Sequence, residues 1–427
     1  MDQTFSPMGR ISGRLTVPAD KSIAHRAFLL AAMAGGSSRI AGRIAGEDVS
    51  STMRCVEVLG AGIERRGPGQ YSVAGTGWSI PDEASLDCGN SGTTMRLLAG
   101  ALAGRPGSFL LTGDASLSRR PMERVAEPLR RMGAAVDTSA AGRPPIRVTG
   151  ARLHPISYAG PVASAQVKSA ILLAGLQAEG TTTVEEPEPS RDHTERMLAW
   201  LGCQVGVEGR SVAVTGGEEL FRHPGFVMKV PGDLSSAAFW IVAAVLAPKG
   251  RVTVEGAGLN PGRTGVLEIL AAMGADLQVD RFADQPEPFG SVTAAAGSLQ
   301  ATEIGGPLIP RTVDELPLIA LAATQAEGVT VIRDAAELRV KETDRIAVLA
   351  AGLRTMGAKV EDRPDGLVIE GPTPLHGGVV DAAGDHRMAL TFAVAGLIGR
   401  DSVTVRGWEA ANVSYPQFLD DLAEVAG

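Results

Sequence analysis

Residues 265–279 read GVLEILAAMGADLQV, an amphipathic helical pattern that ends in Met-Gly and runs into a short strand. The same phrase, a helix ending in Leu or Met followed by Gly and a strand, recurs along the chain, and a degenerate copy closes it at 418–427. Because Gly readily adopts the left-handed conformation that ends a helix, each copy predicts a helix, a glycine turn and a strand. The other four copies are 52–64, 124–136, 194–205 and 347–360.

A second phrase alternates with the first. It is a helix of small apolar residues, a Gly-containing turn and a β-branched strand, as in AFWIVAAVLAPKGRVTVEG at 238–256. A helix with almost no polar face is expected to be buried, whereas the charged helix of the first phrase should lie nearer the surface. The other five copies are 27–42, 94–113, 169–186, 318–335 and 390–407.

Six copies of each phrase predict an α/β (α+β) fold of six units, each with two helices and several short strands. Three units can share one hydrophobic core, which gives two domains of similar build in a chain of 427 residues. A solenoid of six stacked units is the alternative, but its apolar helices would lack neighbours on every side.

Composition excludes several classes of protein. The chain is 44% hydrophobic and 21% charged, with a formal net charge of −8, which argues against general binding of nucleic acid or anionic membranes. Neither a membrane span nor a secretory signal is evident. Cys55, Cys88 and Cys203 form no CxxC motif, so we interpret them as reduced, mostly buried thiols of a cytoplasmic protein.

A polar phrase precedes each fully apolar helix, where unpaired N–H groups and the helix dipole favour anions. Ser, Thr, Asn and Asp there are also ordinary N-caps, and capping alone is the preferred interpretation of GDLSSA and TVDELP. Lys21, Arg26 and Arg387 beside such caps indicate an anion site, while Lys168 is also compatible with a solvated side chain. The six phrases are DKSIAHR (20–26), CGNSGTTMR (88–96), ASAQVKS (163–169), GDLSSA (232–237), TVDELP (312–317) and GDHRM (384–388).

Two arginine clusters fit the same anion site. LSRRPMERV carries Arg119, Arg120 and Arg124, and RVKETDRIAVL places Lys341 and Arg345 four residues apart, on one face of an expected helix. A lattice of salt bridges with Glu337, Glu342 and Asp344 explains the second cluster equally well. The sequence has no HExxH, no GxxxxGK[ST] and no GxSxG, which disfavours zinc, nucleoside triphosphate and serine-hydrolase chemistry.

These motifs together resemble the 5-enolpyruvylshikimate-3-phosphate synthase family of enolpyruvyl transferases over essentially the whole chain. The matching phrases are PADKSIAHR, GNSGTTMRLL, SRRPM, SAQVKSAILLAGL, SRDHTE, DELP, RVKETDR and DHRMA. The resemblance implies two inside-out α/β domains, each of three βαβαββ units. It places one domain at 1–19 and 233–427, and the other at 20–232.

The resemblance also implies a reaction. The family transfers the enolpyruvyl group of phosphoenolpyruvate to the 5-hydroxyl of shikimate 3-phosphate and releases phosphate, through a tetrahedral ketal and without a metal or organic cofactor. Both substrates carry phosphate and carboxylate groups, as the cationic phrases require. We therefore expect a cytoplasmic monomer whose partners are these two small molecules, with neither nucleic acid nor membrane involved.

Site residues follow from the matching motifs. Asp314 corresponds to the family's proposed proton acceptor, and Glu342 and Lys21 are the other acid–base candidates; the roles among the three stay open. The expected shikimate 3-phosphate ligands are Lys21, Ser22, Arg26, Ser164, Ala165, Gln166, Arg191, Asp314 and Lys341. The expected phosphoenolpyruvate ligands are Lys21, Asn90, Gly92, Arg120, Gln166, Arg345 and Arg387.

One departure and two rivals accompany this interpretation. Many relatives carry a lysine just before the last Tyr-Pro or Phe-Pro, where this chain has Val413 and Ser414. The UDP-N-acetylglucosamine enolpyruvyl transferases share the repeat but use a cysteine where this chain has SRRPM. A non-catalytic anion-binding repeat protein is the other rival, although such a protein gains nothing from Asp314 and Glu342 among its cations.

Overall fold

The structure, a computed structural model, describes residues 1–426 and divides the backbone into two compact units. Unit 2 comprises Ala19–Pro231 together with the short segment Gln285–Glu287. Unit 1 comprises Met1–Pro18, Gly232–Asp284 and the chain from Pro288 onward. Each unit has its own hydrophobic core, so the solenoid alternative is wrong.

Unit 2 contains three four-stranded mixed sheets built to one plan. In each sheet the first two strands are parallel, and the last two form an antiparallel hairpin. In sheet order, the strands are β14 (Val227–Lys229), β3 (Ser37–Ala41), β5 (Gln70–Ala74) and β4 (Gly62–Gly67); β6 (Glu83–Asp87), β7 (Gly107–Thr112), β9 (Ile146–Gly150) and β8 (Ala135–Asp137); and β10 (Ser157–Ala159), β11 (Thr181–Glu185), β13 (Ser211–Thr215) and β12 (Val205–Glu208).

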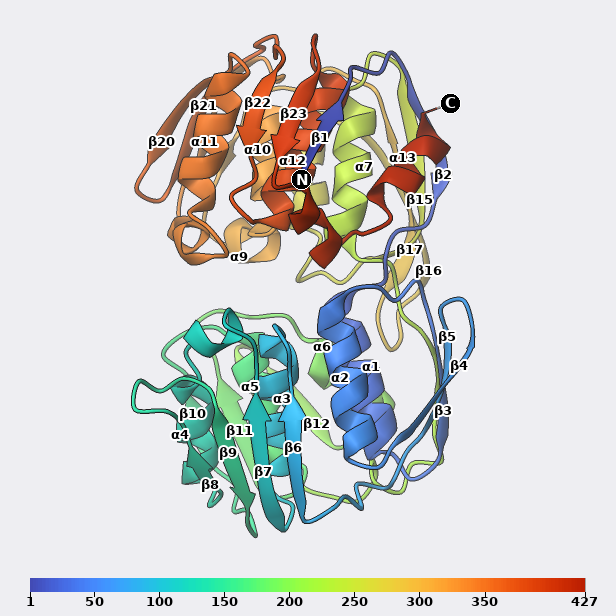
Figure 1. The fold of residues 1–427 in the computed structure, drawn as a ribbon, viewed down its shortest axis with the longest axis vertical. Helices are drawn as coiled ribbons and strands as arrows, with labels where there is room; N and C mark the ends of the chain where they lie inside the picture. Colours follow the sequence, from blue (N-terminus) through green and yellow to red (C-terminus); the bar gives the residue numbers. More distant parts are fainter. Residues whose placement is uncertain (427) are drawn as a thin grey trace. The chain divides into compact units, whose positions relative to one another are not determined.

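Unit 1 repeats the plan twice and ends with a three-stranded sheet. This last sheet is completed by the N-terminal strand β1, which lies beside β23 near the other end of the chain (Figure 1). The strands are β2 (Ile11–Leu15), β15 (Gly250–Gly258), β17 (Phe289–Ala295) and β16 (Asp276–Ala283); β18 (Glu303–Ile304), β19 (Gly328–Ile332), β21 (Gly366–Gly371) and β20 (Lys359–Arg363); and β22 (Gly378–Asp381), β23 (Val403–Arg406) and β1 (Asp2–Phe5).

The first strands of two repeats are exchanged where the chain passes between the units. Strand β2 directly precedes the first helix of unit 2 but pairs in parallel with β15 of unit 1. Strand β14 directly precedes the passage into unit 1 but pairs in parallel with β3 of unit 2. Each unit therefore has a complete set of parallel strand pairs, although neither exchanged strand pairs with the next strand of the chain.

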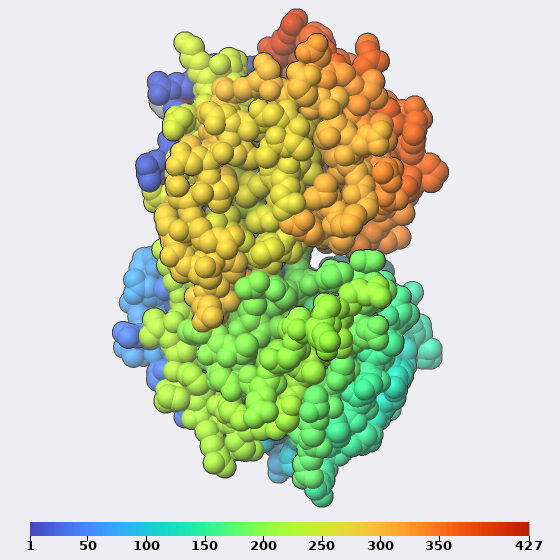
Figure 2. All heavy atoms as spheres, turned by 180° about the vertical axis from the view of Figure 1, so that it is seen from behind, coloured from blue at the N-terminus to red at the C-terminus, as the bar shows by residue number. Residues whose placement is uncertain are grey.

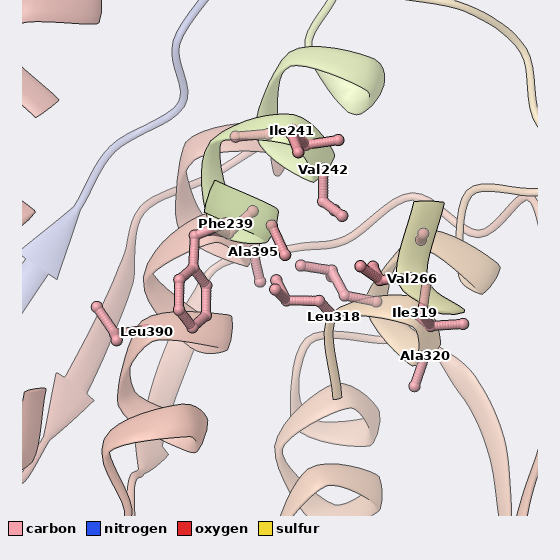
Figure 3. Close-up of a cluster of buried hydrophobic side chains, with 14 of the residues drawn as sticks. Phe239, Ile241, Val242, Val266, Leu318, Ile319, Ala320, Leu390 and Ala395 are labelled. Carbon is pink, nitrogen blue, oxygen red and sulfur yellow. The ribbon is translucent and has the colours of Figure 1, made fainter. Parts of the chain in front are cut away.

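The apolar helices form the two cores, as expected. In unit 1 all residues from Leu234 to Val245 are buried, and side chains from three of these helices and from Val266 interdigitate (Figure 3). Small residues allow close approach in unit 2, since a Cβ at Gly100 would lie 2.2 Å from the carbonyl oxygen of Ala170. The apolar helices are α1 (Lys21–Met33), α3 (Gly92–Leu102), α5 (Ala165–Gly175), α7 (Leu234–Leu246), α10 (Leu316–Ala323) and α12 (His386–Ile398).

The charged helices bury one face each and follow the first sequence phrase. They are α2 (Glu47–Val58), α4 (Glu123–Arg131), α6 (His193–Trp200), α8 (Gly265–Ala272), α11 (Arg345–Thr355) and α13 (Phe418–Val425). Short helical turns complete the fold: η1 (Leu117–Arg119), α9 (Leu308–Thr312), η2 (Ala336–Val340) and η3 (Trp408–Val413). The α/β class and the repeated βαβαββ plan are thus confirmed.

The glycine turns of the first phrase are also confirmed. Gly60, Gly133, Gly202, Gly274 and Gly357 have φ of +101°, +110°, +85°, +89° and +91°, values that side chains with a Cβ rarely adopt. The sixth copy ends on residue 427, which lies outside the described residues. All three cysteines are buried and free, as expected. Among residues 1–426, no helix combines the length and the apolar character that crossing a membrane requires.

Candidate active site

The polar phrases of unit 2 do cap the helices that they precede. Asp20 accepts a hydrogen bond from the backbone N–H of Ile23 at 3.0 Å, and Ser91 accepts one from Thr94 at 3.1 Å. Ser164 caps α5 in the same way, through the N–H of Val167. Capping therefore explains the Asp and Ser residues of these phrases but not the neighbouring cations.

Arg26 is fixed inside unit 2 by hydrogen bonds on every guanidinium nitrogen. Its Nε donates to Thr194 Oγ1 at 2.6 Å, one terminal nitrogen donates to Ser169 Oγ at 2.7 Å, and the other to the carbonyl of Ser22 at 2.8 Å. Each terminal nitrogen still has a second N–H. Nearby, Lys21 Nζ lies 3.3 Å from the Asp48 carboxylate and remains partly exposed.

The electrostatic surroundings of Arg26 include a carboxylate from a distant part of the sequence. Burial lowers the pKa of the Arg26 guanidinium, and Arg191 lowers it further. Glu195, Asp20 and Glu287 oppose this effect. Arg191, in the loop before α6, therefore belongs to the same electrostatic neighbourhood as Arg26.

An arginine cluster without carboxylate partners lies at the start of α3. A Cβ placed on Gly92 would be 2.9 Å from a terminal nitrogen of Arg96 and 3.3 Å from one of Arg120. Burial, followed by repulsion from Arg124 and Arg120, lowers the pKa of Arg96 to about 10. Within residues 1–426, neither Arg120 nor Arg124 has an ion pair with a carboxylate. This surplus of positive charge is suited to a small anion.

Arg96 belongs to this arginine cluster, and sequence reasoning missed it. It donates to Gln166 Oε1, and Gln166 Nε2 donates to Thr93 Oγ1 at 2.8 Å, so the starts of α3 and α5 are joined. Its position four residues after Gly92, on the same face of the helix, was the available signal. Beside them, Asn90 Oδ1 is buried and has no hydrogen-bond partner among the described residues.

Lys168 is buried, so the interpretation as a solvated side chain is wrong. Its Nζ lies 2.7 Å from Glu186 Oε2 and 2.7 Å from Glu195 Oε1. Glu186 also accepts the N–H of Ser164 at 3.0 Å and the hydroxyl of Ser190 at 2.6 Å. Burial opposes the charged form, but Glu195 and Glu186 outweigh it and raise the pKa of Lys168. Lys168 thus fixes the backbone at Ser164 indirectly, because it holds the Glu186 carboxylate that accepts the Ser164 N–H.

A buried hydrogen-bond chain connects helices α1, α2 and α3. His25 Nδ1 lies 2.7 Å from Thr52 Oγ1, Thr52 lies 2.7 Å from Thr94 Oγ1, and Thr94 donates to Ser91 at 2.8 Å. Burial lowers the pKa of His25 to about 4. Lys21 and Arg26 act in the same direction, while Asp48 and Asp20 oppose it, so the imidazole is neutral at pH 7.

Neutral, buried His25 makes the stability of the protein depend on pH. Below pH 6.5 the unfolded chain binds a proton that the folded chain excludes until about pH 4, so folding weakens as the pH falls through this window. Between pH 7 and pH 5 we expect His25 to contribute a loss of about 2 kcal/mol. Urea unfolding should show this loss for the wild type and for His154→Gln, an exposed control, but not for His25→Gln. An equal loss in His25→Gln would contradict the assignment.

In unit 1, Asp314 lies between two arginines at the start of α10. Its Oδ1 is 3.4 Å from a terminal nitrogen of Arg345, and its Oδ2 is 3.6 Å from one of Arg387. Asp314 remains partly exposed, whereas the side chain of Arg345 is 2% exposed. The carboxylate is thus oriented by two cations and stays partly accessible from outside.

Arg345 is surrounded by three carboxylates. Besides Asp314, its Nε donates to Asp385 at 2.8 Å, and a terminal nitrogen donates to Glu342 at 2.7 Å. Burial works against the charged form, but the three carboxylates outweigh it and raise the pKa of Arg345. Asp385 also caps α12 through the backbone N–H of Arg387 at 2.7 Å, so one buried carboxylate holds the guanidinium of Arg345 and the backbone of Arg387.

Lys341 does not share a helical face with Arg345, and that expectation is wrong. Asp344 caps α11 by accepting the N–H of Ala347 at 3.0 Å, so the helix begins at Arg345 and Lys341 stays in extended backbone. The alternative lattice is present, because Lys341 pairs with Glu337, Arg345 with Glu342 and Arg339 with Asp344. Val413, at the end of η3, is exposed and supplies no charge.

A second buried network in unit 1 was not anticipated. Arg263 donates to Asp233 at 2.8 Å and to Ser235 Oγ at 2.6 Å, and Ser235 donates to Glu315. Burial raises the pKa of Glu315, although Arg263 opposes this. GDLSSA does cap its helix, because Asp233 accepts the backbone N–H of Ser235 at 2.9 Å. The capping interpretation of TVDELP is wrong, because within residues 1–426 no side chain caps the start of α10. Both phrases take part in this network, which anchors the backbone beside Asp314.

The two units thus offer different chemistry. Unit 2 has an arginine cluster with surplus positive charge, whereas in unit 1 carboxylates match the cations, and one of them, Asp314, is partly exposed. In the part of the chain that the structure describes, no group of three or more His, Cys, Asp or Glu side chains could hold a metal ion. Surplus cations suit an anion, and a partly exposed carboxylate between arginines is a candidate for acid–base chemistry.

Comparison with known proteins gives first the fold and then the family. The enolpyruvyl transferase NikO from Streptomyces tendae has the same fold at 21% identity, with a TM-score of 0.78 over 99% of this chain and 96% of that one. The family model of EPSP synthase (3-phosphoshikimate 1-carboxyvinyltransferase) matches residues 5–422, and this chain belongs to that family.

Individual relatives are similar to this chain over nearly their whole length. The 3-phosphoshikimate 1-carboxyvinyltransferase of Gloeobacter violaceus is 50% identical, over 100% of this chain and 99% of the relative. That of Bacillus licheniformis is 48% identical, over 98% and 99%. The EPSP synthase structure from Acinetobacter baumannii has a TM-score of 0.92 at 43% identity, over 100% of this chain and 98% of that one.

Proposed function

We propose that this chain transfers the enolpyruvyl group of phosphoenolpyruvate to the 5-hydroxyl of shikimate 3-phosphate, the step of the shikimate pathway that its family catalyses. The hydroxyl oxygen bonds to C2 of phosphoenolpyruvate while C3 takes up a proton, which gives a tetrahedral ketal. A proton then leaves C3, the bond from C2 to the phosphate oxygen breaks, and phosphate departs.

The roles of the residues follow from the two clusters. We add Arg96 to the residues that hold phosphoenolpyruvate because of its uncompensated charge. The other ligands of phosphoenolpyruvate are Lys21, Asn90, Gly92, Arg120, Gln166, Arg345 and Arg387. Asp314 accepts the proton of the 5-hydroxyl, and Glu342 and Lys21 are the candidates for protonating C3. Shikimate 3-phosphate is held by Lys21, Ser22, Arg26, Ser164, Ala165, Gln166, Arg191, Asp314 and Lys341.

The observation that carries this assignment is the position of Asp314 between Arg345 and Arg387. A protein that only bound anions would lose affinity by placing a partly exposed carboxylate there. The decisive assay is phosphate release from phosphoenolpyruvate, which should require shikimate 3-phosphate. Release supported by UDP-N-acetylglucosamine instead, or no release at all, would contradict the proposal.

Two coarser expectations remain proposals. We infer a monomer, whose mass by light scattering should be near 44.1 kDa. We also infer a cytoplasmic location, which fractionation of cells that produce the protein would test.

The Gly92→Ala variant should weaken the binding of the inhibitor glyphosate more than the binding of phosphoenolpyruvate, the substrate that glyphosate mimics. The added methyl would press on the ends of Arg96 and Arg120, which are flexible enough to yield. Glyphosate is longer than phosphoenolpyruvate and meets the methyl first. We expect inhibition of the wild type that is competitive with phosphoenolpyruvate, and a rise of the inhibition constant in the variant that exceeds the rise in KM by about 10-fold or more.

Gly206→Ala is the matched control, because a Cβ there would have no atom within 4 Å. It should leave both constants unchanged. If Gly92→Ala also left the inhibition constant unchanged, Gly92 would serve only the turn geometry of the loop.

A further inference from the structure

The tip of the β16–β17 hairpin belongs to unit 2, although both strands of the hairpin belong to unit 1. The tip is the amber segment seen against green atoms of unit 2 in Figure 2. Gln285 and Pro286 of the tip line a hollow of about 330 Å³ together with Arg196, Ala199 and Trp200 of α6. The tip therefore lies along α6, the helix that begins within the phrase SRDHTE.

Glu287, at the end of this tip, forms a buried pair with the first residue of α6. Its Oε1 lies 2.8 Å from His193 Nδ1, and each side chain is 1% exposed. The carboxylate can only accept, so Nδ1 carries the proton. A hydrogen bond to a buried carboxylate is stronger than one between neutral groups, so this contact holds the start of α6 firmly.

The next two residues of α6 make buried polar contacts with other segments. Thr194 Oγ1 accepts from Arg26 Nε at 2.6 Å and lies 2.6 Å from Ser169 Oγ. Glu195 lies 2.7 Å from Lys168 Nζ. We call residues 193–195 the α6 anchor, because three successive side chains attach the start of this helix to the hairpin tip, to α1 and to α5.

The α6 anchor connects Glu287 to the proposed ligands of shikimate 3-phosphate. Arg26 is held directly by Thr194, and Arg191 lies two residues before His193. Moving the start of α6 would therefore misplace both arginines while leaving the arginine cluster of α3 intact. We propose that Glu287 is a positioning residue for shikimate 3-phosphate, acting through His193 on Arg26 and Arg191. This inference rests on the proposed function.

Substitution of Glu287 tests the proposal through a selective change in affinity. Glu287→Ala removes the acceptor of His193, and we expect the Kd and KM of shikimate 3-phosphate to rise about 10-fold. The KM of phosphoenolpyruvate and kcat should change by less than about 3-fold. Glu287→Gln keeps an acceptor oxygen of the same reach, and it should restore most of the affinity. Calorimetry gives Kd, and phosphate release gives kcat and both KM values.

The control is Asp284→Ala, on the same hairpin. The Asp284 side chain is 69% exposed and pairs with Arg281, so its loss should leave every constant unchanged. If Glu287→Ala cannot be purified folded, His193→Gln, which removes the imidazole from the other side, should show the same selective rise.

The outcomes separate this proposal from the one on which it rests. Lower thermal stability with an unchanged affinity for shikimate 3-phosphate, or an equal rise in both KM values, would overturn the positioning role. A wild-type enzyme that released no phosphate with shikimate 3-phosphate would overturn the proposed function before any variant was compared.

Discussion

Replacing Asp314 by Asn is expected to lower kcat by about 10²- to 10⁴-fold, the range typical for loss of a general base. Asn keeps the shape of the side chain and its oxygen toward Arg345 or Arg387, but an amide cannot take the proton of the 5-hydroxyl. The KM of phosphoenolpyruvate should change far less than kcat, because Asp385 still holds the guanidinium of Arg345 and the backbone N–H of Arg387. Steady-state phosphate release measures both constants.

A control variant shows whether the loss is specific to this carboxylate. Asp362 also pairs with an arginine of unit 1, Arg354, at 2.6 Å, but on an exposed hairpin. Asp362→Asn should keep wild-type kcat. If Asp314→Asn retained kcat within about 3-fold, the base would have to be Glu342 or Lys21, and Glu342→Gln would then be the next variant to assay.

Of the substitutions proposed, Lys168→Met should lower the free energy of unfolding most. Met matches the length of Lys but leaves Glu186 and Glu195 buried without their cation. Breaking a buried ion pair by removing one partner typically lowers the free energy of unfolding by about 3–5 kcal/mol. Urea unfolding at pH 7 should show a loss of this size. Arg152→Met, which breaks an exposed pair with Glu179 in the same unit, should change stability little.

The loss in Lys168→Met should also shrink as the pH falls. Burial already raises the pKa of Glu195 in the presence of Lys168, and removing that positive charge raises it further. A carboxyl whose folded-state pKa is raised stabilises the fold below its unfolded pKa and loses this stabilisation as the pH rises. The difference between wild type and variant should therefore be smaller at pH 5 than at pH 7. If the difference did not change with pH, the loss of stability would not arise from the unpaired charge of Glu195.

Local patterns made much of the fold predictable. The five turn glycines all have positive φ, and each polar phrase stands at the start of an apolar helix, because both features depend on residues within one or two turns of each other. The exchange of β2 and β14 was not predictable in this way. Both strands have ordinary apolar patterns, and their partners β15 and β3 are selected by contacts remote in sequence.

For the candidate site, too, local features were predictable and contacts remote in sequence were not. Most residues within the matching phrases lie at the expected helix starts, but the contacts between different phrases could not be derived from the sequence. The sequence did not show that Glu186 and Glu195 both pair with Lys168 and bury it. Nor did it show that Arg96 lies with Arg120 beside Gly92. The misplacement of Lys341 was avoidable, because Asp344 before Arg345 is an ordinary N-cap.

The strand pairing of β1 and β2 has a consequence for folding during synthesis. All twelve strands of unit 2 have emerged by residue 229, yet β2 must wait for its partner β15 at 250–258, and β1 for β23 at 403–406. At about 5–20 residues per second, β1 stays unpaired for roughly 20 to 80 seconds on the ribosome. The unit that contains the N-terminus therefore finishes folding last, after the unit inserted within it.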